Sequence, residues 1–324
     1  MNSSNKKMTI CAVICICIGA ILMLVSYVAA GFDLSKISTI KLEEKVYSVS
    51  DDFDKIKVQG VQANVYFVLS EDNKCRVEAM ETEGMSYNVE VVDKELIISV
   101  DNNEKWYDRM ICLSLEEEKM VIRLPKSEYE TLLVKKQSGN IKISDNISIT
   151  DVDITATSGN VKLSGIEKTE NISIKTNSGS VKLSDIEKTE KIDIKLTSGN
   201  VKLSDITEVK NINIKTSSGE IKLSNCETKD IQMQTNSGDI ETKKLMAEDS
   251  ITIQTNSGEV DLNNSDAEEL NIKTNSGDVS CSLLTNKIFI THANSGDVHV
   301  PYSTSGGKCE IKTNSGDIRV KIKK

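Results

Sequence analysis

Aromatic residues, proline and histidine are scarce in this 324-residue chain. Only 4% of the residues are Phe, Trp or Tyr, and there are two prolines and two histidines. A hydrophobic core with this composition has to be aliphatic, and from Thr131 onwards only Phe289 and Tyr302 could stack on a sugar ring. The net charge is −9, and no basic patch is interleaved with aromatic residues, which argues against nucleic acid as a partner.

Recognisable catalytic and metal-binding motifs are also missing. No CxxC pair occurs outside the apolar N-terminal stretch, the cysteine spacing matches no zinc site, and no Gly-rich phosphate loop is present. His292 and His299 have no Ser or Cys partner in a recognisable frame. A polysaccharide-cleaving β-helix needs one unique pair of carboxylates, whereas the carboxylates here recur from repeat to repeat. We therefore expect no catalytic residue, no cofactor and no enzymatic activity.

What the chain does contain is a repeat. A Ser-Gly pair recurs ten times from Thr131 to the C-terminus, with a spacing of 19 or 20 residues, at Gly139, Gly159, Gly179, Gly199, Gly219, Gly238, Gly258, Gly277, Gly296 and Gly316. A constant period in this range is typical of architectures made of stacked repeats.

Each repeat has two segments in which apolar and polar residues alternate, one before and one after the Ser-Gly turn. The second residue after every repeat glycine is Ile or Val, and alternation with β-branched residues indicates half-buried strands. Equivalent residues need equivalent surroundings, which stacked coils provide and a hairpin meander does not. The sequence predicts an all-β fold, a parallel β-solenoid of about ten coils over residues 131–324.

The N-terminus is apolar and uncharged from Met8 to Phe32, which is long enough to span a bilayer. Lys6 and Lys7 precede this stretch, so we expect residues 1–7 in the cytoplasm, a transmembrane anchor at 8–32 and the remainder of a single-pass protein outside the cell. The alternative is a signal peptide cleaved after Val28-Ala29-Ala30, which would make the protein secreted. Residues 33–45 read as a polar linker.

The two ends of the solenoid need protection. Residues 46–130 contain short strand patterns that do not repeat, and they are expected to form an N-terminal β cap. At the C-terminus, Arg319–Lys324 alternates Lys or Arg with aliphatic residues, which predicts a guarded terminal edge. Before Gly296, Ile288 and Ile290 stand one residue too early in the repeat, which suggests a β-bulge.

The cysteines outside the apolar stretch are expected to be buried thiols. Cys226, Cys281 and Cys309 replace aliphatic residues of the repeat. A disulfide between Cys75 and Cys112 stays open, because no known spacing supports it.

Stacking would align polar residues in columns. The residue after each repeat glycine is neutral in the first half and acidic in the second, so Asp239, Asp278, Asp297 and Asp317 are the candidates for a calcium site. The other interpretation is turn chemistry, in which Asp and Asn accept hydrogen bonds from turn amides. No calcium-binding nonapeptide repeat is present.

Lysines form two further columns, which could attract an anionic wall polymer such as teichoic acid or could keep the rod soluble. One column lies three residues after the glycines (Lys142, Lys162, Lys182, Lys202, Lys222), and the other lies four residues before them (Lys175, Lys195, Lys215, Lys273, Lys312). A threonine column has the parity of the buried Ile positions, so its hydroxyls should point inwards.

The order of several segments resembles a known family. Phe53-Asp54-Lys55-Ile56, Ala63-Asn64-Val65, Leu96-Ile97-Ile98 and Ile122-Arg123-Leu124-Pro125 lead into repeated Thr-Asn-Ser-Gly-Asp, an order similar to that of the DUF4097 β-strand-repeat family, also labelled adhesin-like or LiaG-like. The resemblance covers nearly everything after the apolar stretch. It implies a membrane-tethered envelope protein, typically from Gram-positive bacteria, and brings no catalytic or binding residues with it.

These features together predict a non-catalytic, membrane-anchored scaffold outside the cell. It would contact an envelope polymer or surface partners in the manner of an adhesin. The alternative is an accessory protein of an envelope-stress response that binds a membrane protein. A polysaccharide-active β-helix enzyme is the third candidate.

Overall fold

A computed structural model describes residues 3–29, 42–82, 85–102, 118–144 and 146–323. Helix α1 (Ser3–Ala29) contains the segment Ala12–Ala29, whose mean hydropathy of 2.7 and length suffice to cross a membrane. The expected N-terminal apolar helix is therefore confirmed. A signal sequence has the same properties, so retention of the helix and its orientation stay predictions. Most of the predicted linker, and Cys112 with its disulfide, lie outside the described residues.

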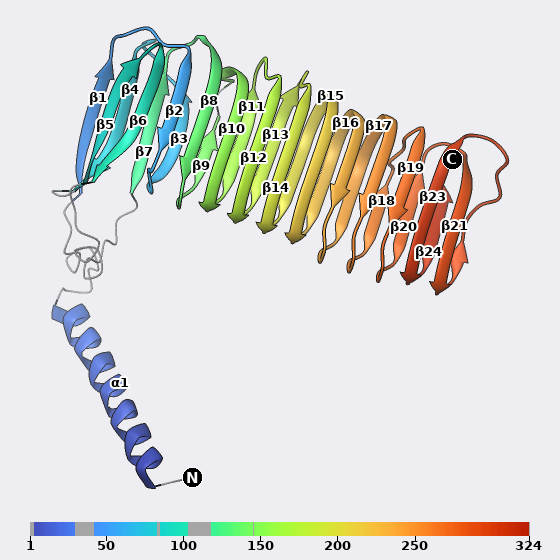
Figure 1. Cartoon of the computed structure of the whole chain (residues 1–324), viewed down its shortest axis with the longest axis horizontal. Helices are drawn as coiled ribbons and strands as arrows, with labels where there is room; N and C mark the ends of the chain where they lie inside the picture. Colours follow the sequence, from blue (N-terminus) through green and yellow to red (C-terminus); the bar gives the residue numbers. More distant parts are fainter. Residues whose placement is uncertain (1–2, 30–41, 83–84, 103–117, 145, 324) are drawn as a thin grey trace.

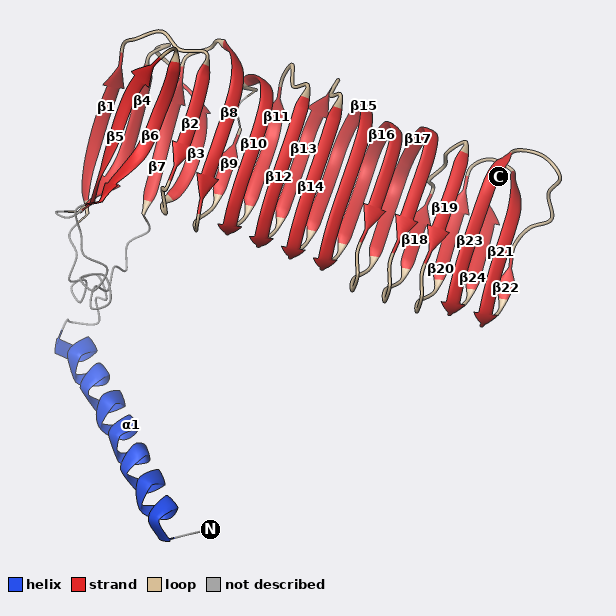
Figure 2. Cartoon of the chain, in the orientation of Figure 1, coloured by secondary structure: helices blue, strands red, loops and turns tan. Residues whose placement is uncertain are grey.

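The strands form one elongated stack with two faces (Figures 1 and 2). We call the strands that precede the Ser-Gly turns the pre-turn face and those that follow them the post-turn face. Repeat-equivalent residues pair directly in parallel, for example Ile194 with Ile214 and Val181 with Val201. This register confirms the predicted parallel β-solenoid of about ten coils.

The repeat strands alternate between the two faces, and the longer ones run from one face to the other. They are β8 (Glu128–Lys136), β9 (Ile141–Ile143), β10 (Ser148–Ser158), β11 (Val161–Ile166), β12 (Asn171–Ser178), β13 (Val181–Glu187), β14 (Lys191–Ser198), β15 (Val201–Ser218), β16 (Ile221–Gln234), β17 (Ile240–Gln254), β18 (Val260–Asn263), β19 (Glu269–Lys273), β20 (Val279–Leu283), β21 (Lys287–Ser295), β22 (Val298–His299), β23 (Gly307–Ser315) and β24 (Ile318–Ile322). Register shifts within β15–β16 and β16–β17 occur where coils of 19 and 20 residues meet.

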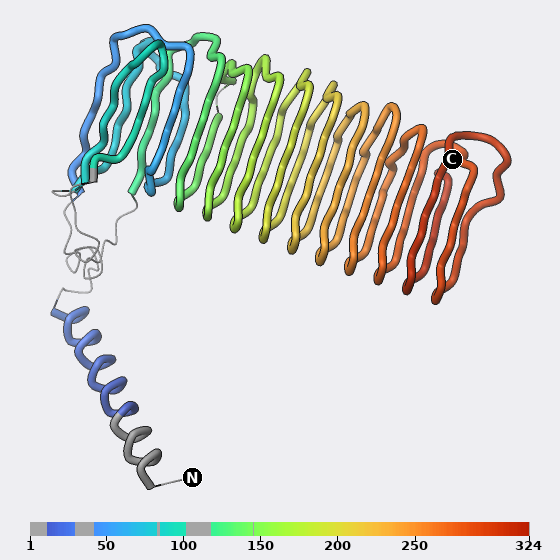
Figure 3. The backbone as a smooth tube through the Cα atoms, viewed as in Figure 1, coloured from blue at the N-terminus to red at the C-terminus, as the bar shows by residue number. Residues whose placement is uncertain are grey.

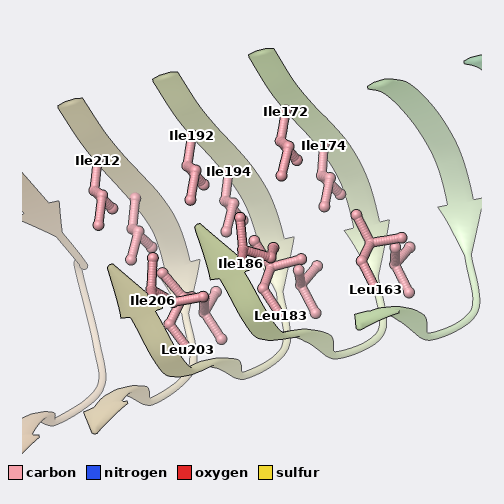
Figure 4. Packing of buried hydrophobic residues seen from close by; sticks show 14 of the residues in the cluster. Leu163, Ile172, Ile174, Leu183, Ile186, Ile192, Ile194, Leu203, Ile206 and Ile212 are labelled. Atoms are coloured by element: carbon pink, nitrogen blue, oxygen red, sulfur yellow. The ribbon is translucent and has the colours of Figure 1, made fainter. Parts of the chain in front are cut away.

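The core between the faces is aliphatic, as the composition requires. Figure 4 shows Ile172 and Ile174 of the pre-turn face packing beside Leu163 and Leu183 of the post-turn face, and all four side chains are buried. The threonine column also points inwards, since Thr176, Thr216, Thr235, Thr255, Thr274 and Thr313 are all buried. Cys226, Cys281 and Cys309 are buried as well, which confirms their predicted place in the core.

The turn glycines are required by close contact between coils. Gly199 has φ 132°, and a Cβ atom there would lie 2.0 Å from the carbonyl oxygen of Gly179 in the preceding coil. No side chain fits at that distance, and non-glycine residues rarely adopt this φ. The Ser-Gly repeat is thus a consequence of the spacing between stacked coils.

The N-terminal region confirms the expected non-repeating β structure and adds a coil to the solenoid. Its strands are β1 (Glu43–Val49), β2 (Lys55–Gln59), β3 (Asn64–Leu69), β4 (Cys75–Glu81), β5 (Met85–Val92), β6 (Glu95–Asn102) and β7 (Lys119–Leu124). β2 pairs in parallel with both β6 and β8, and β3 with both β7 and β9. The β2–β3 coil therefore lies between the later β6–β7 strands and the first repeat. Antiparallel strands close this end: β5 pairs with β6, β4 pairs with β7, and β1 pairs with β4.

The C-terminal end also departs from sequence order. β23 pairs with β19 on one side and β21 on the other, and β24 lies between β20 and β22. The last coil, β23–β24, is therefore inserted between the β19–β20 coil and the β21–β22 coil. Figure 3 shows the loop that leads from the outermost coil back to the inserted one. The prediction of a guarded edge at Arg319–Lys324 was wrong, because β21 and β22 are the outermost strands.

The predicted bulge before Gly296 was also wrong. Residues Lys287–Ala293 pair one to one with Gly307–Thr313. Ile288 and Ile290 are out of phase because they occupy the outer surface, where they are 47% and 48% exposed. Phe289 takes the inward position, in register with the buried Cys309. The shift in the sequence pattern marks an exchange of inner and outer residues.

Candidate functional site

The residues that follow the repeat glycines form a hydrogen-bonded column along the turn edge. The Asn160 N–H donates to Asn140 Oδ1 at 2.9 Å, and the Glu259 N–H donates to Asp239 Oδ1 at 2.9 Å. In each case a short side chain accepts a bond from the backbone of the next coil. These side chains therefore accept hydrogen bonds from turn amides, as the turn interpretation proposed. The sequence suggested that donor and acceptor belong to the same turn, whereas in the structure they belong to neighbouring coils.

The four calcium candidates lie in this column in the order Asp239, Asp278, Asp317, Asp297. Asp278 Oδ1 accepts from the Asp317 N–H, and Asp317 Oδ1 accepts from the Asp297 N–H, both at 2.8 Å. The Asp297 amide and then the Arg319 guanidinium lower the pKa of Asp317 below its usual range. Among the described residues, no three His, Cys, Asp or Glu side chains are grouped to hold a metal. Calcium binding at these residues stays a prediction.

The lysine column of the post-turn face is the most pronounced charge feature of the rod. Lys142, Lys162, Lys182, Lys202 and Lys222 are in direct register, one per coil. Lys162, Lys182 and Lys202 are exposed, and the first four lysines make no ion pair with any described residue. Coils ~4.8 Å apart place these ammonium groups beside one another. Each neighbouring pair repels by up to about 1 kcal/mol at low ionic strength.

A serine column runs beside the lysines and was not identified from the sequence. Ser164, Ser184, Ser204 and Ser224 are in register and lie two residues after the corresponding lysines on the same outward face. Each Ser adds a hydroxyl that can donate and accept beside an ammonium group that only donates. The 20-residue period contained this signal, since Lys-Leu-Ser or Lys-Ile-Ser recurs five times.

The basic column ends at a sharp boundary. Lys222 Nζ lies 2.8 Å from Glu220 Oε1 and 3.2 Å from Glu241 Oε2. Hydrogen bonds to these two carboxylates raise the pKa of Lys222 above its usual range. Beyond this point Glu241 and Asp261 continue the column, and burial followed by repulsion from Glu241 raises the pKa of Asp261. A polyanion would therefore find a favourable surface only on the first half of this face.

The pre-turn lysines are also in register but less uniform. Lys175, Lys195 and Lys215 are followed by Gln234 and Gln254 before Lys273 continues the column. Lys195 Nζ is 2.8 Å from Asp193 Oδ2, so part of this charge is neutralised. A polar groove of about 400 Å³ crosses four coils here, lined by Lys, Gln, Thr and Asn side chains. This column is the weaker candidate for binding an anion.

The match to a protein-family model identifies the family. The Toastrack DUF4097 family model matches residues 53–209 and 206–324, which together include almost every described strand. The chain belongs to the DUF4097 family. The resemblance read from the sequence is thereby confirmed. No curated protein sequence matches this DUF4097 chain.

Three solved structures are similar to this DUF4097 chain at low sequence identity. A "putative adhesin" from Bacteroides fragilis is 17% identical, with 87% of this chain and 97% of that chain covered and a TM-score of 0.42. A "putative lipid binding protein" from Parabacteroides distasonis is 15% identical, with 88% and 98% covered and a TM-score of 0.42. A "putative cell adhesion protein" from Clostridium sporogenes is 14% identical, with 87% and 100% covered and a TM-score of 0.29.

Proposed function

We propose that this DUF4097 protein is a non-catalytic scaffold that binds an anionic, phosphate-bearing polymer of the cell envelope along its post-turn face. The observation that carries the proposal is the run of four lysines, Lys142 to Lys202, that stack in register without a carboxylate partner among the described residues. Repulsion within such a column lowers the stability of the rod. A bound polyanion would relieve that repulsion.

The chemistry of the column suits a polymer with regularly spaced phosphates. Ammonium groups are compact point charges that bind phosphate oxygens, and the adjacent serine hydroxyls supply further donors. The binding surface is flat and repeated, so affinity would come from many weak contacts along the polymer. Glu241 and Asp261, which follow Lys222 in the column, would limit the polymer to the coils before Lys222.

Helix α1 would hold the scaffold at the membrane surface. We propose that α1 stays uncleaved, with residues 1–7 in the cytoplasm and the rod outside, because Lys6 and Lys7 precede the apolar segment. Protease treatment of intact cells tests this orientation, since it should digest or release the rod only if the rod is outside. A mature protein that begins after residue 30 would instead establish a cleaved signal.

The binding test uses the full chain in nanodiscs of neutral lipid, with poly(glycerol phosphate) as the probe and uncharged dextran of similar length as the control polymer. Triple substitution of Lys162, Lys182 and Lys202 by Gln should weaken binding by at least about tenfold, and added salt should weaken binding of the wild type. The matched control replaces Lys175, Lys195 and Lys215 by Gln, which removes the same charge from the pre-turn face. Equal losses in both triple variants, or equal binding to dextran, would contradict the assigned surface.

A further inference from the structure

The C-terminal end of the rod is open on both faces. β21 pairs only with β23, and β22 pairs only with β24, among the strands that the structure describes. The outer side of β21 therefore offers backbone N–H and C=O groups over Lys287–Ser295. Such an edge is a template for another strand.

The N-terminal end is protected where the C-terminal end is not. Antiparallel β5 and β1 are the outermost strands there, and β1 begins with Glu43, Glu44 and Lys45. The segment from Ile288 to Gly296 has no Lys, Arg, Asp, Glu or Pro. Charges, proline and bulges are the usual means of blocking an edge, and β21 has none of them beyond its first residue, Lys287, whose charge is buried against Asp266.

The outer surface of β21 has lost the charges of its neighbours. Ile288 and Ile290 are in register with Lys308 and Glu310 of β23, which are in turn in register with Glu269 and Asn271 of β19. Ile288 and Ile290 are about half exposed, and Tyr302 in the following loop is 94% exposed. The change from charged to aliphatic residues is confined to the terminal coil.

The core is also uncovered at this end. Phe289, Ala293, Val300 and Ile322 are only partly buried where they pack against the core, and Val298 of β22 is 40% exposed. An occupant that covers this end has to continue both faces and supply apolar side chains between them. A single extended peptide would pair with β21 and leave the core and β22 uncovered.

We infer that this end binds the same end of a second copy, forming a tail-to-tail dimer. Only a two-layered end of equal thickness continues both faces, and the N-terminal end of another copy is closed by its antiparallel strands. A two-fold axis perpendicular to the faces would place β21 antiparallel to the partner copy's β21, and β22 antiparallel to its β22. An antiparallel register centred on Ile290 keeps Ile288, Ile290 and His292 on the outer surface of both copies and Phe289 and Thr291 in the shared core.

The test measures the mass of the full chain in detergent by sedimentation, over a range of concentrations. Wild-type protein should reach twice the monomer mass, and I288K/I290K should remain monomeric, because in the register centred on Ile290 the charge added at 290 would face its symmetry mate. The control is V46K, which places Lys at an exposed valine on the outermost strand β1 and should leave the dimer intact. Both variants alter exposed positions, and circular dichroism verifies that they fold.

Disulfide trapping then locates the contact. Single cysteines are introduced at Ile288, Phe289, Ile290, Thr291 and His292. Each reports the antiparallel register in which that residue lies opposite its symmetry mate. Oxidation should cross-link one of them far faster than a cysteine introduced at Lys202. Wild-type chain measures any cross-linking through Cys11, Cys15 and Cys17 of α1. The proposal would be overturned if the wild-type protein stayed a monomer at every concentration. It would also be overturned if the dimer survived I288K/I290K, as a dimer formed through α1 would, or if only V46K abolished the dimer.

Discussion

Lys287 Nζ lies 2.6 Å from Asp266 Oδ1, and both side chains are almost completely buried. Asp266 Oδ1 also accepts from the Ala267 N–H, and Asp266 Oδ2 accepts from the N–H groups of Leu284 and Thr285. Asp266 lies just before β19, and Lys287 is the first residue of β21, on the other side of the inserted strand β23. The pair therefore links the two coils between which the last coil is inserted.

Loss of Lys287 should destabilise this end strongly. K287M leaves the Asp266 carboxylate buried without its cation, which should lower the free energy of unfolding by about 3–5 kcal/mol. Hydrogen exchange over residues 287–323 is the appropriate measurement, because the nearby coils should open first. K229M is the matched control, since Lys229 pairs at 3.4 Å with Asp249 and both are about half exposed. Similar effects of the two variants would show that the buried pair does not fix the crossing.

Lys136 should make the stability of the first coil depend on pH. Burial lowers its pKa from 10.5 to about 8, and its Nζ donates to the carbonyl oxygen of Ala63 at 2.6 Å. Because the unfolded chain binds the proton more tightly, charged Lys136 costs the fold about 3 kcal/mol below pH 8, and this cost disappears as pH rises from 8 to 10.5. K136M should therefore be more stable than wild type at pH 7, although the loss of the Lys136 hydrogen bonds reduces this gain.

Chemical denaturation across this pH range measures the effect. The stability advantage of K136M should shrink as pH rises from 8 to 10.5. Other titrating groups, including the buried thiols, act on both proteins and cancel in the difference. K135M alters the exposed neighbouring residue and should show a difference that does not change with pH. A constant difference for K136M as well would mean that Lys136 keeps an ordinary pKa in the fold.

Substitution of a turn glycine that contacts the neighbouring coil should destabilise the rod far more than substitution of a glycine without such a contact. G199A would place Cβ 2.0 Å from the Gly179 carbonyl oxygen at φ 132°. We expect a loss of at least about 3 kcal/mol from strain and clash together. G60A is the control, because Gly60 also has a positive φ, 75°, but its Cβ would meet nothing within 4 Å. Thermal unfolding distinguishes close coil contact from φ alone, and equal shifts would exclude the contact as the cause.

Calcium should have little effect on the rod if the acidic column serves only as turn structure. Amide donors already engage one oxygen of Asp239, Asp278 and Asp317. Millimolar calcium should then raise Tm by less than about 1 °C relative to chelator. A larger rise that disappears in D278N/D317N would instead establish the calcium site that the sequence suggested. Asn keeps the acceptor oxygen, so these variants preserve the hydrogen bonds between coils.

The regular part of the fold could be predicted because every coil has the same surroundings. One 20-residue repeat such as Val201–Glu220 is enough to assign inward and outward residues, and the register follows. The exchange at the C-terminus could not be predicted, because β21 and β23 offer the same backbone pattern to β19. The choice depends on single residues outside the repeat, above all Asp266 and Lys287. The reversed phase of Ile288 and Ile290 was visible in the sequence, but it also fitted a bulge.

The candidate site was only partly readable. The lysine columns followed directly from the period, whereas their neutralisation depends on neighbours in other coils. Lys195 is paired with Asp193 two residues away, and Lys222 is paired across coils with Glu241, while Lys182 has no partner among the described residues. The sequence therefore predicted two columns of five lysines each, and the interruption by Gln234 and Gln254, together with the placement of carboxylates on each face, separates them.

The inserted final coil determines the order in which the C-terminal end of the rod can be assembled. A rod whose coils followed the chain could be assembled in the order of synthesis, and a truncated product would merely be shorter. Here residues 307–322 supply an inner layer on which the preceding residues 287–299 rest. Strands β21 and β22 therefore cannot take their places until residues 307–322 have been synthesised. A chain that stopped before residue 307 would lack the layer beneath β21 and β22, so this tip can form only after a later part of the sequence is present.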